Sequence, residues 1–173
     1  MFKRLADMKS VFNQLMRRPL SVDDILNSEF SYEQEYVKYI DEQRRVHTAS
    51  HYGDILKQPV EPVVKIEGFE KFSLEFFMGC QGIAIRQGHY GPVTAHLFIS
   101  PADGLSFPMH TDPDDVVIVM LEGSKRFCGH DEDQLLVAGD FMLIPKNYHH
   151  RAINVTDNLM LSVGLESFTV EKL

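Results

Sequence analysis

The sequence predicts a mostly β protein, a sandwich or barrel of short strands with helices near its N-terminus. From Val63 onward, apolar runs of about four to eight residues recur at short intervals and are separated by Gly, Pro and Asp, a pattern typical of sandwiches and barrels. Before that point, apolar residues recur at spacings of three and four, which indicates amphipathic helices. At 173 residues, with 44% hydrophobic and 24% charged content, the chain has the size and composition of one globular domain.

Residues 1–62 are expected to form helices and a linking loop, and residues 63–173 the barrel, within one structural domain. Apolar positions at helical spacing predict an amphipathic helix from Phe2 to Arg17 that ends near Pro19. The N-terminal helices could serve as a lid over a pocket or as the surface of a homodimer, but packing on the outside of the barrel is the simpler interpretation.

Two further helices and a loop are expected before the barrel. Ser21 is placed to cap a short helix with an acidic first turn, because a serine oxygen and acidic side chains both stabilise the amino end of a helix. Ser31 is expected to open a longer helix that continues to Arg44. The periodicity fades between His47 and Pro62, where glycine and prolines indicate a loop.

The barrel segment is expected to consist of short strands rich in apolar and β-branched residues. In chain order these predicted strands cover residues 63–66, 82–86, 94–99, 116–121, 126–128, 134–137, 141–144, 151–154 and 159–165.

His110 and Asp112 are the leading candidates for a metal site. Residues i and i+2 of an extended strand face the same way, about 6 to 7 Å apart along the backbone, so both can reach one ion. A third ligand is available at His149 or His150 after the apolar run 141–144, and only one of these neighbours can face inward. Two imidazoles and one carboxylate can hold an iron(II) on one face and leave the opposite face open for small ligands and dioxygen.

A histidine hydrogen-bonded to a nearby aspartate is also a common structural pair, so His110 and Asp112 alone are a weak signal. The context favours a metal, because two strand-like apolar runs flanked by metal-capable residues are separated by a short polar stretch. His96, on the predicted strand 94–99, could also line a pocket, although a lone strand histidine more often has a structural role.

The same region resembles the Jumonji-C-like cupins, a family of iron(II)- and 2-oxoglutarate-dependent oxygenases that includes asparaginyl hydroxylases and bacterial ribosomal-protein oxygenases. The elements that carry the resemblance follow in the family's order and spacing: His110-Thr111-Asp112, residues 116–121, Glu122–Phe127, Gly139–Pro145 and His150. The resemblance covers roughly residues 83–168, about half of the chain. It implies a double-stranded β-helix, the cupin or jelly-roll barrel, with the N-terminal helices packed outside it.

The resemblance also implies roles for individual residues. Iron(II) would be held by His110, Asp112 and His150, which selects His150 over its neighbour. In the family, a lysine or arginine 15 residues after the first metal histidine grips the distal carboxylate of 2-oxoglutarate, and Lys125 occupies that position. Some relatives place a threonine that bonds the cosubstrate where this chain has Phe107, so another hydroxyl has to serve here.

Strand alternation gives a competing assignment for the side-chain cation that binds the cosubstrate. Counting in twos from His110 along an uninterrupted strand puts Arg126, not Lys125, on the metal's face. A kink at Pro113 or a bulge near Gly123 would reverse this register, and we follow the family spacing and favour Lys125.

The resemblance predicts an oxygenase that hydroxylates an unactivated C–H bond of a small molecule or peptide. The short connection 128–138 between the two metal-bearing strands argues against a macromolecular substrate groove. Two alternatives remain, a metal-dependent cupin enzyme that does not use 2-oxoglutarate and a non-catalytic metabolite-binding cupin, because fold alone does not decide function.

Composition restricts the partners. Seventeen basic against 25 acidic residues give a net charge of −8, which argues against a general nucleic-acid or anionic-membrane surface. No apolar run approaches the roughly 20 residues needed to span a bilayer, and the N-terminus lacks the apolar segment of a signal peptide. Cys80 and Cys128 lack the spacing of a zinc or redox motif and are expected to be free thiols. We therefore expect a cytoplasmic protein with neither nucleic acid nor membrane as partner.

Overall fold

The fold is that of a computed structural model, which describes residues 1–17 and 21–167. Pro19, at the expected end of the first helix, and residues 168–173 of the expected barrel lie outside the described residues. The described helices are α1 (Lys9–Leu15), α2 (Val22–Leu26), α3 (Glu29–Glu33), α4 (Tyr52–Leu56), the 3-10 helix η1 (Phe69–Lys71) and α5 (Leu74–Arg86). None of these helices is long and apolar enough to cross a membrane.

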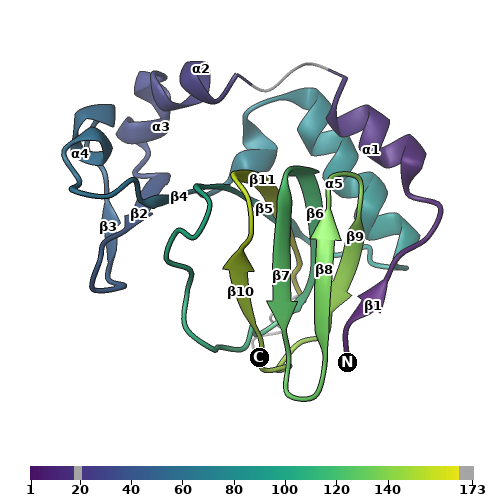
Figure 1. Cartoon of the computed structure of the whole chain (residues 1–173). Coiled ribbons are helices and arrows are strands. Elements are labelled where there is room, and N and C mark those ends of the chain that lie inside the picture. The colour runs from purple at the N-terminus through teal and green to yellow at the C-terminus, as the bar shows by residue number, and fades with distance from the viewer. Residues whose placement is uncertain (18–20, 168–173) are drawn as a thin grey trace, which may run out of the picture.

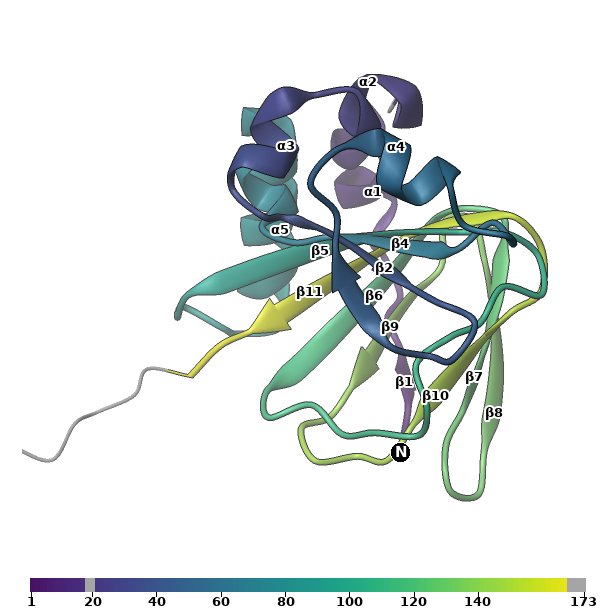
Figure 2. The ribbon, with the colours of Figure 1, turned by 90° about the vertical axis from the view of Figure 1, so that its left-hand side faces the viewer.

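The strands form two antiparallel sheets (Figure 1). Their bounds are β1 (Lys3–Arg4), β2 (Val37–Ile40), β3 (Val46–Thr48), β4 (Val63–Ile66), β5 (Val93–Ser100), β6 (Asp115–Glu122), β7 (Ser124–Cys128), β8 (Asp133–Val137), β9 (Phe141–Ile144), β10 (Arg151–Asn154) and β11 (Asn158–Leu165). The larger sheet has the order β1-β9-β6-β11-β5-β4-β2-β3, and the smaller one the order β10-β7-β8. Figure 2 shows the helices on one side of the larger sheet and the smaller sheet on the other.

Side-chain alternation gives the larger sheet two buried faces. Odd-numbered residues of β6 and β11, such as Val117 and Leu161, pack in one cluster with residues of α1 and α5. Even-numbered residues, such as Ile118 and Met160, pack in a second cluster with Phe127 of the smaller sheet. Because both faces are covered, β6 is buried along nearly its whole length. Its sequence is accordingly one continuous apolar run.

Several sequence predictions are confirmed. The strand expected at 63–66 and all those expected beyond residue 90 are present, with ends that agree within two residues. The Oγ of Ser21 accepts a hydrogen bond from the amide of Asp24 at 3.2 Å and caps α2 as expected. Cys80 and Cys128 are buried free thiols.

The strand predicted at residues 82–86 is wrong, because this run is the last part of α5. The helix begins after Ser73, whose Oγ accepts a hydrogen bond from the amide of Phe76 at 3.1 Å. A short apolar run such as Ile83–Ile85 fits a buried helix turn as well as a strand, so its periodicity could not decide between them.

Three predictions for the N-terminal region are also wrong. The first helix begins at Lys9 rather than Phe2, because Lys3–Arg4 form β1 at the edge of the larger sheet, paired with β9. The helix expected from Ser31 to Arg44 is only the short α3 followed by β2, which pairs with β3 and β4. The expected loop 47–62 contains the end of β3 and all of α4. Strand pairing overrode local periodicity in β1 and β2.

The turn between β6 and β7 depends on Gly123, which has a φ of +67°. An added Cβ there would collide with the backbone oxygen of Asp157. At Gly139, φ is +92° but a Cβ would meet nothing within 4 Å.

We therefore expect Gly123→Ala to reduce the free energy of unfolding more than Gly139→Ala, which carries only the left-handed backbone penalty of about 1 to 2 kcal/mol. Urea unfolding of both variants measures the difference. Equal losses would show that the β6–β7 turn tolerates a Cβ.

Candidate metal centre

Two loops bring the candidate metal ligands together. His110 and Asp112 lie between β5 and β6, and His150 immediately precedes β10. The amide of His110 donates to the carbonyl of His150 at 2.9 Å, and the amide of His150 donates back to the carbonyl of His110 at 2.9 Å. The amide of Asn147 donates to the carbonyl of Asp112 at 2.8 Å. These backbone bonds hold the three residues in register although they lie outside the long strands.

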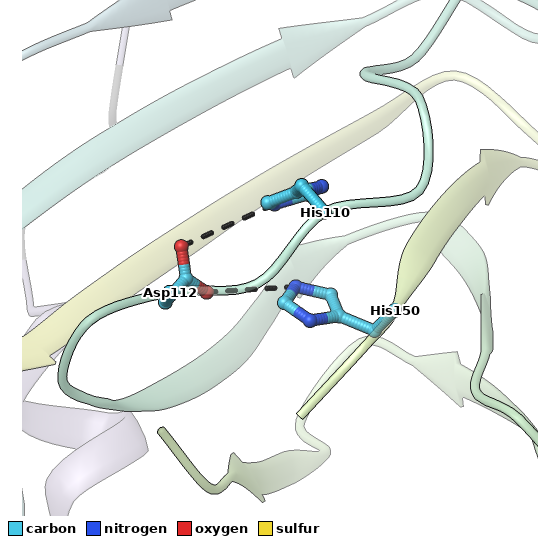
Figure 3. Close-up of side chains that lie close together, drawn as sticks. All are labelled: His110, Asp112 and His150. Atoms are coloured by element: carbon cyan, nitrogen blue, oxygen red, sulfur yellow. Dashed lines mark ion pairs between the residues drawn. The ribbon is translucent and has the colours of Figure 1, made fainter. Parts of the chain in front are cut away.

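The three side chains converge, and the carboxylate of Asp112 faces both imidazoles (Figure 3). Nε2 of His110 lies 4.0 Å from Oδ1 of Asp112, and Nε2 of His150 lies 3.5 Å from Oδ2. The ligand atoms all lie within 4.8 Å of one another, and no other such group occurs in the part of the chain that the structure describes. Donors about 2.0 to 2.2 Å from a shared ion lie roughly 3 to 4 Å apart, so small side-chain adjustments suffice to bind one metal ion.

Backbone carbonyls orient both imidazoles. Nδ1 of His110 lies 2.8 Å from the carbonyl oxygen of Pro108, and Nδ1 of His150 lies 2.9 Å from that of Tyr148. Because a carbonyl only accepts hydrogen bonds, Nδ1 of each ring carries a proton, and in the neutral ring Nε2 is the bare nitrogen that faces Asp112. This is the arrangement in which protein histidines bind metals through Nε2.

The site is buried on one side and open on the other. His150 is 5% exposed, and its neighbour His149 is exposed, as alternation requires. The side chains of His110 and Asp112 are 40% and 29% exposed. Burial lowers the pKa of His150, and the neighbouring His110 acts in the same direction, so this imidazole stays neutral and able to bind a metal near neutral pH. Two nitrogens and one carboxylate suit iron(II) and other first-row divalent ions.

The three ligands line a pocket of about 290 Å³ between the two sheets, near the lower end of the range for small-molecule sites. Most of the other lining residues come from alternate positions on the facing strands: Lys65, His96, Phe98, Ile118, Lys125, Phe127, Ala152, Met160 and Ser162, together with Val63, Ser106 and Phe107.

Lys125 lies at the buried end of this pocket and is 2% exposed. Its Nζ donates to Oγ of Ser100 at 3.3 Å and lies 5.6 Å from the centre of the Phe98 ring. Among the described residues no carboxylate forms an ion pair with it. Burial lowers its pKa to about 7, because the charged ammonium has lost its water without gaining a counter-ion. A buried cation without a partner is costly, so this arrangement favours an anionic ligand.

Arg126 is exposed, so the alternation count from His110 pointed to the wrong face. Pocket-facing residues are even-numbered on β5, β6 and β11 but odd-numbered on β7, where Lys125 and Phe127 face inward. The register changes because β7 belongs to the other sheet and follows the left-handed turn at Gly123.

Sequence reasoning did not single out Phe98, Ser100 or Ser162 around the pocket, although they share the parity of His96 on the paired strands β5 and β11.

Phe107 packs edge-on against Phe98, with ring centres 6.1 Å apart. Ser106, beside it, accepts a hydrogen bond from Asn154 at 3.1 Å. Ser106 and Ser162 are the serine hydroxyls among the residues that line the pocket, and Ser100 contacts the pocket residue Lys125. The parity of β5 would have identified Phe98 and Ser100, but only the strand register identifies Ser162.

A cupin domain model matches residues 96–164, which is less than half of the chain but includes His110, Asp112, Lys125 and His150. No curated protein matches the sequence significantly. The fold is a mostly β cupin fold with N-terminal helices and antiparallel sheets.

Solved structures of the ribosomal oxygenase YcfD from Escherichia coli share this fold. One has 16% sequence identity and a TM-score of 0.67 over 88% of this chain and 45% of that chain. A complex of YcfD with cobalt and succinic acid gives the same values. A complex with cobalt and 2-oxoglutarate has 15% identity and a TM-score of 0.64, again over 88% and 45%. The chain thus spans less than half of the length of the oxygenase that it resembles.

Proposed function

We propose that the protein is an iron(II)- and 2-oxoglutarate-dependent oxygenase that hydroxylates an unactivated C–H bond of a small molecule or peptide. One observation carries this proposal: a His-Asp-His group shares one pocket with a buried lysine that has no acidic partner within residues 1–17 and 21–167. A ligand that chelates a metal at one end and carries a carboxylate at the other would satisfy both, and 2-oxoglutarate is such a molecule. The resemblance to Jumonji-C-like cupins supports the same cosubstrate.

His110, Asp112 and His150 would hold the iron. When bound, iron(II) would activate dioxygen, which is the oxidant; one oxygen atom would enter the substrate and the other the succinate that forms, with carbon dioxide, from 2-oxoglutarate. The chain's own contribution at this end is orientation, since the carbonyls of Pro108 and Tyr148 hold the imidazoles with Nε2 toward the site.

Lys125 would bind the distal carboxylate of the cosubstrate. Its Nζ has three donors and gives one to Ser100, so the remaining donors are available to a carboxylate. Phe98, Ile118, Phe127 and Met160 line the same pocket and exclude water, which strengthens the charge interaction. The pocket volume suits a cosubstrate and the reacting part of a small substrate rather than a bulky one.

Turnover of 2-oxoglutarate tests the proposal. We expect the iron(II)-loaded protein in air to convert 2-oxoglutarate to succinate slowly without a primary substrate and faster with a mixture of metabolites or peptides, as followed by proton NMR. The His149→Ala variant is the matched control and should behave like the wild type. If protein with a full complement of bound iron(II) forms no succinate under either condition, the cosubstrate assignment is wrong.

Binding of 2-oxoglutarate should also take up protons above neutral pH. The pKa of Lys125 is about 7 in the free protein, and a bound carboxylate raises it, so the lysine gains close to one proton when the ligand binds at pH 8 and almost none at pH 6. Affinity is therefore expected to fall with rising pH above 7. Calorimetric titrations in two buffers of different ionisation enthalpy measure the uptake, and a value near zero at pH 8 would contradict this role for Lys125.

A further inference from the structure

His96 lines the same pocket, but the proposed function gives a role only to the three metal ligands and Lys125. It is on β5, directly opposite Ser162 of β11, and both residues line the pocket. Its Nδ1 is fully enclosed and has no hydrogen-bond partner among the described residues. An enclosed polar atom without a hydrogen-bond partner lowers the free energy of unfolding by about 1 to 3 kcal/mol. A histidine is therefore a poor choice at this position for stability alone.

The enclosed nitrogen decides how the ring is protonated. A buried N–H without an acceptor is rarer than a buried acceptor without a donor, so the favoured tautomer has a bare Nδ1 and the proton on Nε2. Of the two ring nitrogens only Nδ1 is enclosed without a partner, so the edge with Nε2 is the polar edge available to the pocket. His96 therefore presents a single hydrogen-bond donor to a bound molecule.

The surroundings keep this donor neutral. Burial lowers the pKa of His96 to about 4, and the charge of Lys65 acts in the same direction, whereas Glu67 and Asp112 act against it. His96 and Asp112 line the same pocket, and Lys125 contacts β5 at Ser100 and Phe98, further along the strand than His96. A neutral donor can bind an oxygen there without adding a second positive charge close to the metal.

The spacing along β5 relates His96 to Lys125. The Nζ of Lys125 contacts Ser100 and the face of Phe98, and successive pocket-facing residues of a strand are about 6 to 7 Å apart. His96 thus lies between one and two such steps from the ammonium group. A zigzag chain of five carbons is about 5 Å long, and hydrogen-bonded carboxyl groups at both ends extend its reach to about 10 or 11 Å. A five-carbon diacid fits this interval.

We propose that His96 donates a hydrogen bond from Nε2 to the metal-proximal carboxylate of a bound 2-oxo acid whose distal carboxylate is held by Lys125. Ser162 lies beside His96 and offers a second hydroxyl donor at the same end. This inference rests on the proposed function, and it adds a residue that selects ligands by the oxygens at their metal end.

The test uses zinc(II)-loaded protein, 2-oxoglutarate as the probe and isothermal titration calorimetry. We expect His96→Phe to weaken 2-oxoglutarate binding at least about 10-fold, the loss expected for one hydrogen bond to a charged group. His96→Gln keeps an N–H donor near the position of Nε2 and is expected to stay within about threefold of the wild type. Zinc affinity should be unchanged in both variants, and His96→Phe should unfold at the same temperature as the wild type or higher, because it removes the unpartnered Nδ1.

A second measurement reads the tautomer directly. In two-bond proton–nitrogen NMR spectra of the zinc-loaded protein, His96 should show a protonated Nε2 and a bare Nδ1, with a shift of the Nε2 signal when 2-oxoglutarate binds. Unchanged 2-oxoglutarate affinity in His96→Phe, or a protonated Nδ1, would overturn the inference that His96 donates a hydrogen bond to the 2-oxo acid. Failure of the wild type to bind 2-oxoglutarate would instead refute the proposed function itself.

Discussion

Replacing His150 with alanine is expected to abolish metal binding, whereas replacing its neighbour His149 is expected to leave metal binding unchanged. His150 is buried and lies 3.5 Å from the carboxylate of Asp112, while His149 is exposed. Changes to groups that merely support a metal ligand lower affinity about 10- to 100-fold, so the loss of a ligand should exceed that range. The pair is well matched, because the two variants differ by one position in the chain.

Cobalt(II) titration followed by visible absorption measures this effect, because bound cobalt has a spectrum of its own. His110→Ala and Asp112→Ala are expected to behave like His150→Ala. Metal should also raise the melting temperature of the wild type and of His149→Ala, but not of the ligand variants, since a ligand that binds only the folded state stabilises it. Saturable cobalt binding by His150→Ala at wild-type affinity would exclude this metal centre.

Replacing Lys125 with methionine is expected to weaken 2-oxoglutarate binding and to stabilise the protein. The variant loses the buried ammonium that would hold the distal carboxylate, and one charged contact of this kind accounts for about 10- to 150-fold in affinity. Arg126→Met is the matched control, because Arg126 is the adjacent cation on the exposed face. If Lys125→Met left turnover untouched, the alternative of a metal-dependent cupin enzyme that does not use 2-oxoglutarate would be favoured.

The gain in stability should depend on pH. The pKa of Lys125 is about 7 in the folded protein and 10.5 as its ordinary value, so the unfolded chain holds more protons between these limits. The wild type therefore becomes more stable as pH rises through this window, and its penalty is largest below pH 7. Lys125→Met removes a penalty on the order of 5 kcal/mol at pH 6 and progressively less toward pH 10. Urea unfolding at pH 6 and pH 9 measures the difference, and a gain that did not shrink at pH 9 would contradict the buried charge.

The barrel strands could be predicted from the sequence because each buries apolar side chains in a short run ended by a turn residue. The run 141–144 and the strand at 151–154 agree with the structure to the residue. The run 82–86 could not be assigned in this way, since a buried helix such as α5 shows no alternation. The strand β2 was missed because its pairing with β3 and β4 does not show in the local spacing of apolar residues.

The candidate site shows the same division between local and long-range information. The convergence of His110 and Asp112 follows from their spacing, but the contact with His150 depends on a backbone bridge between two loops. Alternation favoured Arg126 over Lys125, because a local pattern does not show that the chain crosses to the other sheet at Gly123. The unpartnered Nδ1 of His96 has no sequence signal at all, since it depends on what surrounds the ring.

The most direct test of the central claim is the visible spectrum of the wild-type protein with iron(II) under anaerobic conditions. If the three ligands hold iron beside Lys125, adding 2-oxoglutarate should produce the weak charge-transfer band of a chelated 2-oxo acid, and adding succinate should not. The band should be absent in Asp112→Ala and should need much higher 2-oxoglutarate in Lys125→Met. No band at saturating 2-oxoglutarate, in protein that has bound one iron(II) per chain, would contradict the account.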